Sequence, residues 1–157
     1  MSSPAGKRRR KIIFRHLGEV LPEVRRLAPG CETVSRWSLG QICAHLAASF
    51  DGSMDGFHYS RHRTKRFLIA KPMLWYTYLF GIPEQYQVDP GIEPHEEVPV
   101  DVGVDRLTRA ITRYEAFSGR LMPHPLFGRM SRSQWDRVHG IHCAHHLSFV
   151  RPAGGIY

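Results

Sequence analysis

Residues 35–50 read SRWSLGQICAHLAASF, and this stretch decides the fold more than any other part of the chain. A face of this kind, with large apolar residues three or four positions apart, is typical of an α-helix that packs on a core. Ser35 or Ser38 can cap its first turn, because a serine side chain accepts hydrogen bonds from free backbone amides. The apolar positions are Leu39, Ile42, Leu46 and Phe50.

A second stretch, HGIHCAHH at residues 139–146, holds four of the ten histidines of the chain. If the segment is helical, His142 and His146 lie one turn apart on one face, and His139 falls on the same narrow arc. Two neutral imidazoles four residues apart can converge on one metal ion. His145 points away from that arc, and we expect it to be solvated.

His45 stands within an otherwise apolar run, A-H-L-A-A, of the first helix. A buried histidine must find partners for its ring nitrogens. One interpretation is a hydrogen-bonded core histidine, and the other is a third imidazole that shares a metal with the histidines of the last helix. The cluster on that helix has its own alternative, a solvated face, and His139 can form the rim of a pocket. Three protein ligands with open positions are typical of a catalytic metal site.

Several other side chains fall beside these histidines. Cys43 and Cys143 lie off the histidine faces, so we expect them in the core. Without thiolate ligands, zinc, nickel, iron and manganese all remain candidates for the metal. Asp51, Asp55 and Tyr59 either line the mouth of a pocket or belong to a solvated face. The residues predicted to line the pocket or to contact the metal ligands are Gln41, Ser49, Trp135, His139 and Phe149.

The rest of the chain also favours helices, because few β-branched runs alternate with period two. We expect helices near residues 18–27, 65–80 and 105–117, and a last helix that starts at Ser131 or Ser133. Pro72 should kink or delay the helix over 65–80. Residues 81–102, rich in proline, glycine and acidic groups, should form a long loop that acts as a lid or a substrate wall. The sequence thus predicts an all-α bundle of five helices.

The charge of the chain is concentrated near its start. The formal net charge is +8 over 157 residues, but six of the 22 basic residues lie between Lys7 and Arg15, and 16 basic residues face 14 acidic ones elsewhere. We expect residues 1–11 to be a disordered basic leader and residues 12–157 to form one domain. The run K-R-R-R-K can contact nucleic-acid phosphates. A solubilising tail is the interpretation that we favour, since no aromatic residues are interleaved with it.

Three cysteines are too few for a disulfide framework, which favours a reduced, cytoplasmic setting. The apolar run after the basic leader is too short for a signal peptide. The longest apolar stretch, residues 72–82, is too short to span a bilayer. We therefore expect no membrane partner and leave a homodimer open.

Two segments together carry a family resemblance. W-S-L-G-Q-I-C-A-H-L, followed about a hundred residues later by W-D-R-V-H-G-I-H-C-A-H-H-L-S-F, resembles the DinB-like superfamily of metalloenzymes. More narrowly, H-P-L-F-G and H-C-A-H-H-L-S-F resemble a bacterial family of unknown function within it. The resemblance covers roughly residues 12–151. It implies an up-down-down-up four-helix bundle, with a metal held by His45, His142 and His146.

The resemblance also suggests a chemistry, because some DinB-like proteins are thiol S-transferases that use a low-molecular-weight thiol. Many DinB-like helices carry a glutamate before the first histidine, whereas Gln41 stands here one turn before His45. That difference removes an obvious general base and argues against a hydrolase. We expect a metal-dependent transferase that activates a small thiol. The alternatives are a non-catalytic metal- or ligand-binding stress-related protein and, less favoured, nucleic-acid binding through the leader.

Overall fold

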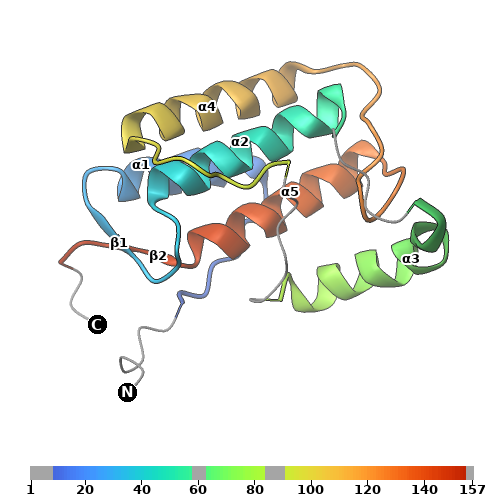
Figure 1. The fold of residues 1–157 in the computed structure, drawn as a ribbon, viewed down its shortest axis with the longest axis horizontal. Helices are drawn as coiled ribbons and strands as arrows, with labels where there is room; N and C mark the ends of the chain where they lie inside the picture. Colours follow the sequence, from blue (N-terminus) through green and yellow to red (C-terminus); the bar gives the residue numbers. More distant parts are fainter. Residues whose placement is uncertain (1–8, 58–62, 84–90, 155–157) are drawn as a thin grey trace.

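The computed structural model describes residues 9–57, 63–83 and 91–154, and within these ranges the chain is mostly helical (Figure 1). A short 3-10 helix, η1, precedes the first α-helix. The elements in chain order are η1 Leu17–Glu19, α1 Val20–Leu27, β1 Cys31–Thr33, α2 Leu39–Asp55, α3 Arg63–Phe80, α4 Val100–Ala116, α5 Arg132–Leu147 and β2 Val150–Pro152.

Both helices that carry the candidate ligands begin with a capping box. The Ser38 side chain accepts from the Gln41 backbone amide at the start of α2, and the Gln41 side-chain oxygen accepts from the Ser38 backbone amide. Ser131 and Gln134 repeat the arrangement at the start of α5. Each box satisfies backbone amides that a helix otherwise leaves free at its first turn. The two serines therefore fix where α2 and α5 start.

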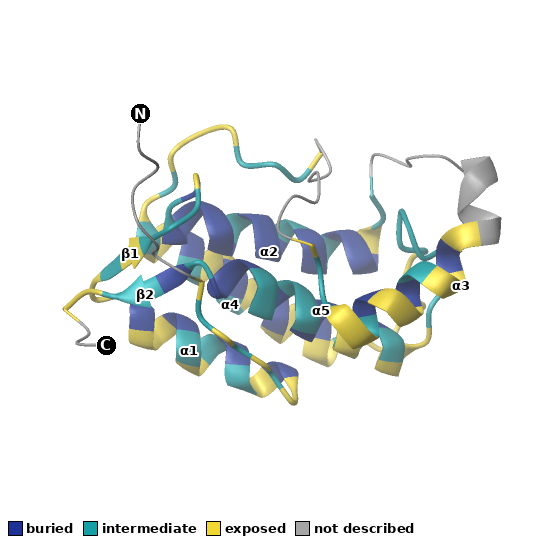
Figure 2. Ribbon diagram, turned by 90° about the horizontal axis from the view of Figure 1, so that it is seen from below, coloured by how far each residue is buried: buried dark blue, intermediate teal, exposed yellow. Residues whose placement is uncertain are grey.

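Helix α2 is the centre of the core, and almost its whole length is buried (Figure 2). It runs between α4 and α5 in Figure 1. The predicted apolar face is buried, since Leu39, Ile42, Leu46 and Phe50 are each at most 1% exposed. Core residues from α1, α4 and α5 pack against it. The helix predicted from residues 35–50 is thus the element around which the others assemble.

A small antiparallel sheet is the one departure from the predicted all-α class within the described residues. Strands β1 and β2 pair Cys31 with Pro152 and Thr33 with Val150. Each strand has three residues, which is too short for a period-two pattern to appear in the sequence. The sheet ties the α1–α2 connection to the segment that follows α5.

Helix α4 begins at Val100, five residues before the predicted start and inside the predicted loop over 81–102. Pro99 precedes the first turn, and its fixed φ is compatible with a helix start. Pro72 lies inside α3, which continues from Arg63 to Phe80. At 18 residues α3 is the longest described helix. No helix in the described parts of the chain is long and apolar enough to cross a membrane.

The end of the predicted basic leader is attached to the body at Arg10. Its guanidinium donates to the Glu23 carboxylate at 2.7 Å and to the carbonyl oxygens of Leu147 and Val150. Its backbone amide donates to the Ser148 carbonyl at 2.7 Å. Residues 1–8 lie outside the described part of the chain. Arg10 therefore connects the start of the described chain to α1 and to the end of α5.

Helices α2 and α4 approach each other closely at two glycines. A Cβ atom added to Gly103 would lie 2.4 Å from the Gly40 carbonyl oxygen, and one added to Gly40 would lie 2.0 Å from the Val98 carbonyl oxygen. Backbone atoms cannot move aside as a flexible side chain can. The absence of a side chain at Gly103 sets the distance between the two helices, and its absence at Gly40 lets residues 98–99 lie against the start of α2.

We expect Gly103→Ala to destabilise the protein by roughly 1–3 kcal/mol, because overpacking at the α2–α4 contact outweighs the better helix propensity of alanine. Gly140→Ala in α5 is the matched control, since the nearest atom that its Cβ would meet outside the neighbouring helix backbone is the Phe14 carbonyl oxygen, at 3.8 Å. That variant should gain roughly 0.5–1 kcal/mol. Urea unfolding followed by circular dichroism measures both. Equal effects of the two substitutions would contradict the close-packing argument.

Candidate metal centre

The structure brings His45 of α2 together with His142 and His146 of α5. The Nε2 atom of His142 lies 3.0 Å from Nε2 of His45 and 3.1 Å from Nε2 of His146. One potential ligand atom from each of the three histidines lies within 4.8 Å of the other two. Because α5 is helical here, His142 and His146 are one turn apart and face α2 together. This group of three can hold a metal ion.

The tautomer of His45 follows from its other ring nitrogen. Nδ1 of His45 lies 2.8 Å from the carbonyl oxygen of Ile92. A carbonyl oxygen only accepts, so Nδ1 carries the proton and donates it. In the neutral ring Nε2 then carries the lone pair, which faces Nε2 of His142 at 3.0 Å. The Ile92 carbonyl thus orients His45 in the way that is usual for metal-binding histidines.

A count of protons shows that the three histidine rings have too few donors to hydrogen-bond one another fully. With Nε2 of His45 unprotonated, the only hydrogen bond available to the His45–His142 pair is one donated by Nε2 of His142. That one proton cannot be donated fully to His146 as well, and a proton on Nε2 of His146 would only face the N–H group of His142. A cation among the three nitrogens would accept a lone pair from each ring. The geometry therefore suits a metal better than a hydrogen-bonded trio.

Burial keeps the two candidate ligands of α5, His142 and His146, neutral. His45 is 2% exposed and His146 is 8% exposed. Burial lowers the pKa of His142 well below its usual value, and the neighbouring His146 and His45 lower it further. The pKa of His146 is lowered in the same way, by burial and then by His45. Neutral imidazole is the form that binds metal, so the environment favours ligation at neutral pH.

Trp37, which was not among the predicted site residues, covers two of the three histidines. Its ring stacks on His146, with centroids 5.4 Å apart and planes at 19°, and it lies 5.0 Å from the His45 ring. The Arg36 guanidinium lies over the Trp37 ring and forms an ion pair with Glu93. Trp37 is the residue before the N-cap, where an apolar side chain often packs back onto the helix. The position before the N-cap was therefore the one sequence feature that indicated a packed Trp37 side chain.

The segment 91–99, the described end of the predicted long loop, lies against α2. It contacts the candidate site through the Ile92 carbonyl and the ion pair of Glu93 with Arg36. The Gln41 side chain donates to the Glu96 carbonyl at 3.0 Å, while its oxygen accepts from the Ser38 amide. Both ends of the Gln41 amide are thus bound to backbone. Residues 84–90 of the predicted loop are outside the described residues.

His139 and Trp135 lie one and two turns before His142, in an aromatic cluster. The His139 ring stacks between Phe50, at 4.0 Å, and Trp135, at 5.0 Å, and meets the edge of Tyr114. Nε2 of His139 and Nε1 of Trp135 have no hydrogen-bond partner among the described residues. Burial lowers the pKa of His139 to about 3, with smaller effects from His124 and Arg132. His139 is not part of the three-histidine group.

The remaining predicted site residues lie at different depths. Ser49 is buried one turn after His45 in α2. The ring of Phe149 meets that of His145 edge-on at 5.3 Å, and the Arg9 guanidinium lies over it at 5.6 Å. The expectation that His145 is solvated is wrong, because it is half-buried and its ring also meets His146 at 4.9 Å. Burial lowers the pKa of His145 to about 4, and the charge of Arg9 contributes.

The two helix cysteines are core residues, as predicted. Cys43 and Cys143 are fully buried, and burial raises the pKa of the Cys43 thiol to about 12. The pKa of Cys143 is raised for the same reason. Neither belongs to the three-histidine group. Thiolate ligation therefore has no part in the candidate site.

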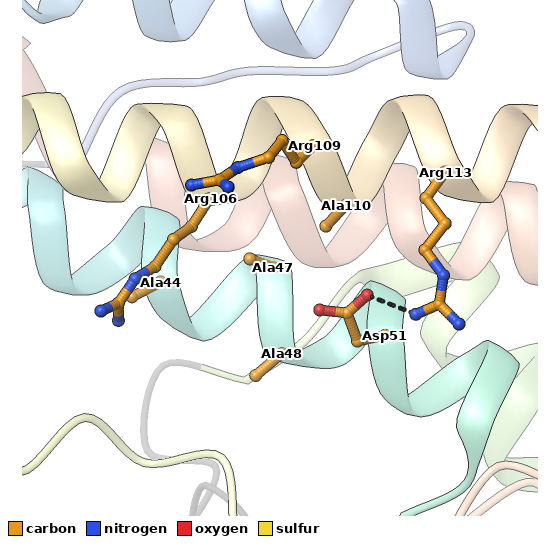
Figure 3. Close-up of a pocket in the computed structure, with 8 residues that line it drawn as sticks. All are labelled: Ala44, Ala47, Ala48, Asp51, Arg106, Arg109, Ala110 and Arg113. Carbon is orange, nitrogen blue, oxygen red and sulfur yellow. Dashed lines mark hydrogen bonds and ion pairs between the residues drawn. The ribbon is translucent and has the colours of Figure 1, made fainter.

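A separate hollow of about 340 Å³ lies between α2 and α4 (Figure 3). It has an alanine floor, and arginines of α4 lie along it. Arg113 binds Asp51 and Asp55, which places these two aspartates on a solvated face, and Arg109 binds Asp105. Tyr59 lies outside the described residues. The hollow is lined by Ala44, Ala47, Ala48, Asp51, Arg106, Arg109, Ala110 and Arg113.

Comparison with known families matches residues 6–153 to the model of one family, described as "Protein of unknown function (DUF1569)". The chain belongs to this family. The match spans all three histidines of the candidate site and the fold from Arg10 to β2. No curated protein and no solved structure matches the chain. The function of this DUF1569 protein has to be argued from its site.

Acid should destabilise the protein through His139. A histidine whose pKa is near 3 when folded and about 6.5 when unfolded binds its proton more readily in the unfolded chain. Its contribution is complete above pH 6.5 and is lost as the pH falls toward 3. Between pH 7 and pH 5 we expect the folded state to lose roughly 2 kcal/mol from this residue.

Urea unfolding at a series of pH values measures this loss. His139→Phe, which keeps an aromatic ring between Phe50 and Trp135, is the comparison, and its stability should fall less steeply below pH 6.5. The other buried histidines still titrate in that variant, so its profile should flatten only in part. Identical slopes for the two proteins would show that His139 is not the source.

Proposed function

We propose that this protein is a metal-dependent enzyme in which His45, His142 and His146 hold a divalent ion that activates a small thiol for transfer. The observation that carries the proposal is the convergence of three imidazole Nε2 atoms, with the lone pair of His45 fixed by the Ile92 carbonyl. Three protein ligands leave positions for substrate, which is the arrangement of catalytic sites.

Each residue of the site has a distinct task in this proposal. His142 and His146 present their nitrogens from one helix face, and His45 completes the set from α2. The stacked Trp37 ring restricts rotation of His146 and shields one side from water. A bound divalent ion would lower the pKa of a thiol and hold the thiolate. The neutral histidines add no competing positive charge.

Thiol transfer suits the groups that are present. The residue one turn before His45 is Gln41, whose amide is held by backbone and offers no general base for hydrolysis. A thiolate is itself the nucleophile, so the chain need not supply one. The thiol would lose its proton to solvent, its sulfur would bond to an electrophilic carbon, and the leaving group would depart with the electron pair.

The donor set bears on the identity of the metal. Three imidazole nitrogens, with no thiolate among them, would suit nickel, iron or manganese at least as well as zinc.

We further propose that the fold is a DinB-like bundle. Helices α1, α2, α4 and α5 share one core, which fits the four helices of such a bundle, and α3 would be the additional helix. The three free cysteines fit a cytoplasmic setting.

A non-catalytic metal-binding role, in a ligand-binding or stress-related protein, is the second candidate. The observation that favours it is the burial of two of the three ligands, since His45 and His146 are buried and His142 is half-buried. Nucleic-acid binding through the leader is weaker, because Arg10 is engaged with Glu23 and with backbone carbonyls. A small-molecule substrate remains the partner that we propose.

Replacing a ligand should remove the metal without unfolding the protein. We expect His142→Ala to retain less than about a tenth of the wild-type metal content, because the remaining two imidazoles form a much weaker site. His145→Ala is the matched control, since it changes a neighbouring histidine of the same helix that is outside the group. Elemental analysis measures metal, and circular dichroism checks the fold. Full metal content in His142→Ala would disprove the assignment.

Thiol activation can be seen directly in cobalt-substituted protein. Glutathione or cysteine should produce a sulfur-to-cobalt absorption band, because a thiolate would enter the open coordination position. The cobalt-treated His142→Ala protein provides the baseline. An electrophile added with the thiol should then be consumed only by metal-loaded wild-type protein. Neither a band nor turnover with any thiol would favour the non-catalytic alternative.

A further inference from the structure

Helix α3 exposes an unusual number of large apolar side chains. Eight large hydrophobic residues are exposed among those whose side chains the structure describes, and five of them lie on α3. Their exposed fractions run from 43% for Ile69 to 70% for Phe80. Exposed hydrophobic residues scattered singly are common, but a contiguous group marks an interaction surface. The group comprises Ile69, Trp75, Tyr76, Leu79 and Phe80, named here the α3 stripe.

The spacing of the α3 stripe is that of helix–helix packing. Ile69, Pro72, Tyr76 and Leu79 follow one another at intervals of three, four and three residues, and Trp75 and Phe80 flank them. This is the interval of an apolar seam between two helices. The inner face of α3 has its own buried residues, Ala70, Leu74 and Thr77, which lie on the opposite side of the helix. The stripe is therefore a second seam, beyond the one that packs α3 on the protein.

We infer that the α3 stripe is the contact surface of a homodimer, in which α3 packs against α3 of a second copy about a twofold axis. A second copy supplies a helix with the same apolar seam, and a twofold contact covers both stripes at once. At roughly 200 Å² for each large side chain, the exposed fractions of the stripe correspond to roughly 600 Å² per copy. Pairing would bury roughly 1,200 Å², the lower end of the range for stable interfaces.

The surface is also compatible with the rest of the protein. The Arg137 guanidinium of α5 lies 4.1 Å from the Tyr78 ring centroid of α3. Tyr78 thus packs α3 on the same copy and is not part of the α3 stripe. The described residues that line the hollow between α2 and α4 all belong to those two helices. The candidate ligands lie on α2 and α5. Dimerisation through the α3 stripe would thus leave the complete candidate metal site within each copy.

The test is the mass of the full-length protein in solution over a range of concentrations, by sedimentation equilibrium. The wild type should weigh twice the 18.0 kDa of one chain. Tyr76→Ser/Leu79→Ser should weaken association at least ~100-fold, because two central apolar anchors are lost. Ile13→Ser, at a residue that is 87% exposed outside α3, is the matched control and should leave the dimer intact. Circular dichroism confirms that the variants fold.

A second measurement locates the contact. In a Cys31→Ser background, which leaves only the two buried cysteines, Tyr76→Cys should form an intermolecular disulfide under mild oxidation, whereas Ile13→Cys should not. A wild type that stays monomeric at high concentration, or a dimer that the double substitution does not weaken, would overturn the inference. So would a monomer that floats with anionic lipid vesicles through the stripe, because the occupant would then be a membrane surface.

Discussion

The pairing of both ring nitrogens of His45 is the constraint on which the rest of the structure depends. A side chain that is 2% exposed cannot rely on water, so each nitrogen needs a partner from the protein or from an ion. Nδ1 finds the Ile92 carbonyl and Nε2 faces His142. These two contacts join three parts of the chain that are far apart in sequence: α2, the segment 91–99 and α5. Moving any one of them would leave a buried polar group unsatisfied, at a cost of about 1–3 kcal/mol.

The other contacts around α2 hold these parts in the positions that His45 requires. The capping box at Ser38 fixes the start of the helix, and the Gln41 amide binds that turn to the Glu96 carbonyl. The missing side chains of Gly40 and Gly103 let the start of α4 approach α2 directly after the segment 91–99. Trp37 then covers the histidines from the residue before the cap. One end of α2 therefore organises packing and candidate chemistry together.

Much of this arrangement could be predicted from the sequence, because its signals are local. Helical spacing indicated the buried face of α2, serine caps indicated where α2 and α5 begin, and the interval from His142 to His146 placed two imidazoles on one face. The remainder depends on contacts between distant segments. The start of α4 at Val100, the pairing of β1 with β2 and the contact of the Ile92 carbonyl with His45 have no local pattern. Trp37 stands before the N-cap, a position that indicates packing on the helix but does not specify that the ring covers His45 and His146. His145 was expected to be solvated because it points away from the arc of the other histidines. Its position on the helix does not show which segment of the chain covers it.

The candidate site and the α3 stripe are connected through α5. Beyond the end of α3, the Ile82 backbone lies beside His145 and raises the pKa of its ring, which meets the ring of His146 edge-on. Nearer the middle of α3, Tyr78 is fixed to α5 by Arg137. In the proposed dimer the second copy would pack on the outer face of α3. This contact would restrain the chain beside His146, one of the proposed ligands. The ligands themselves come from α2 and α5 of one copy, so the metal would not require the dimer. The dimer would instead limit how far α3 and Ile82 can move away from α5, and with them the access of a substrate to His142, the most exposed of the three histidines.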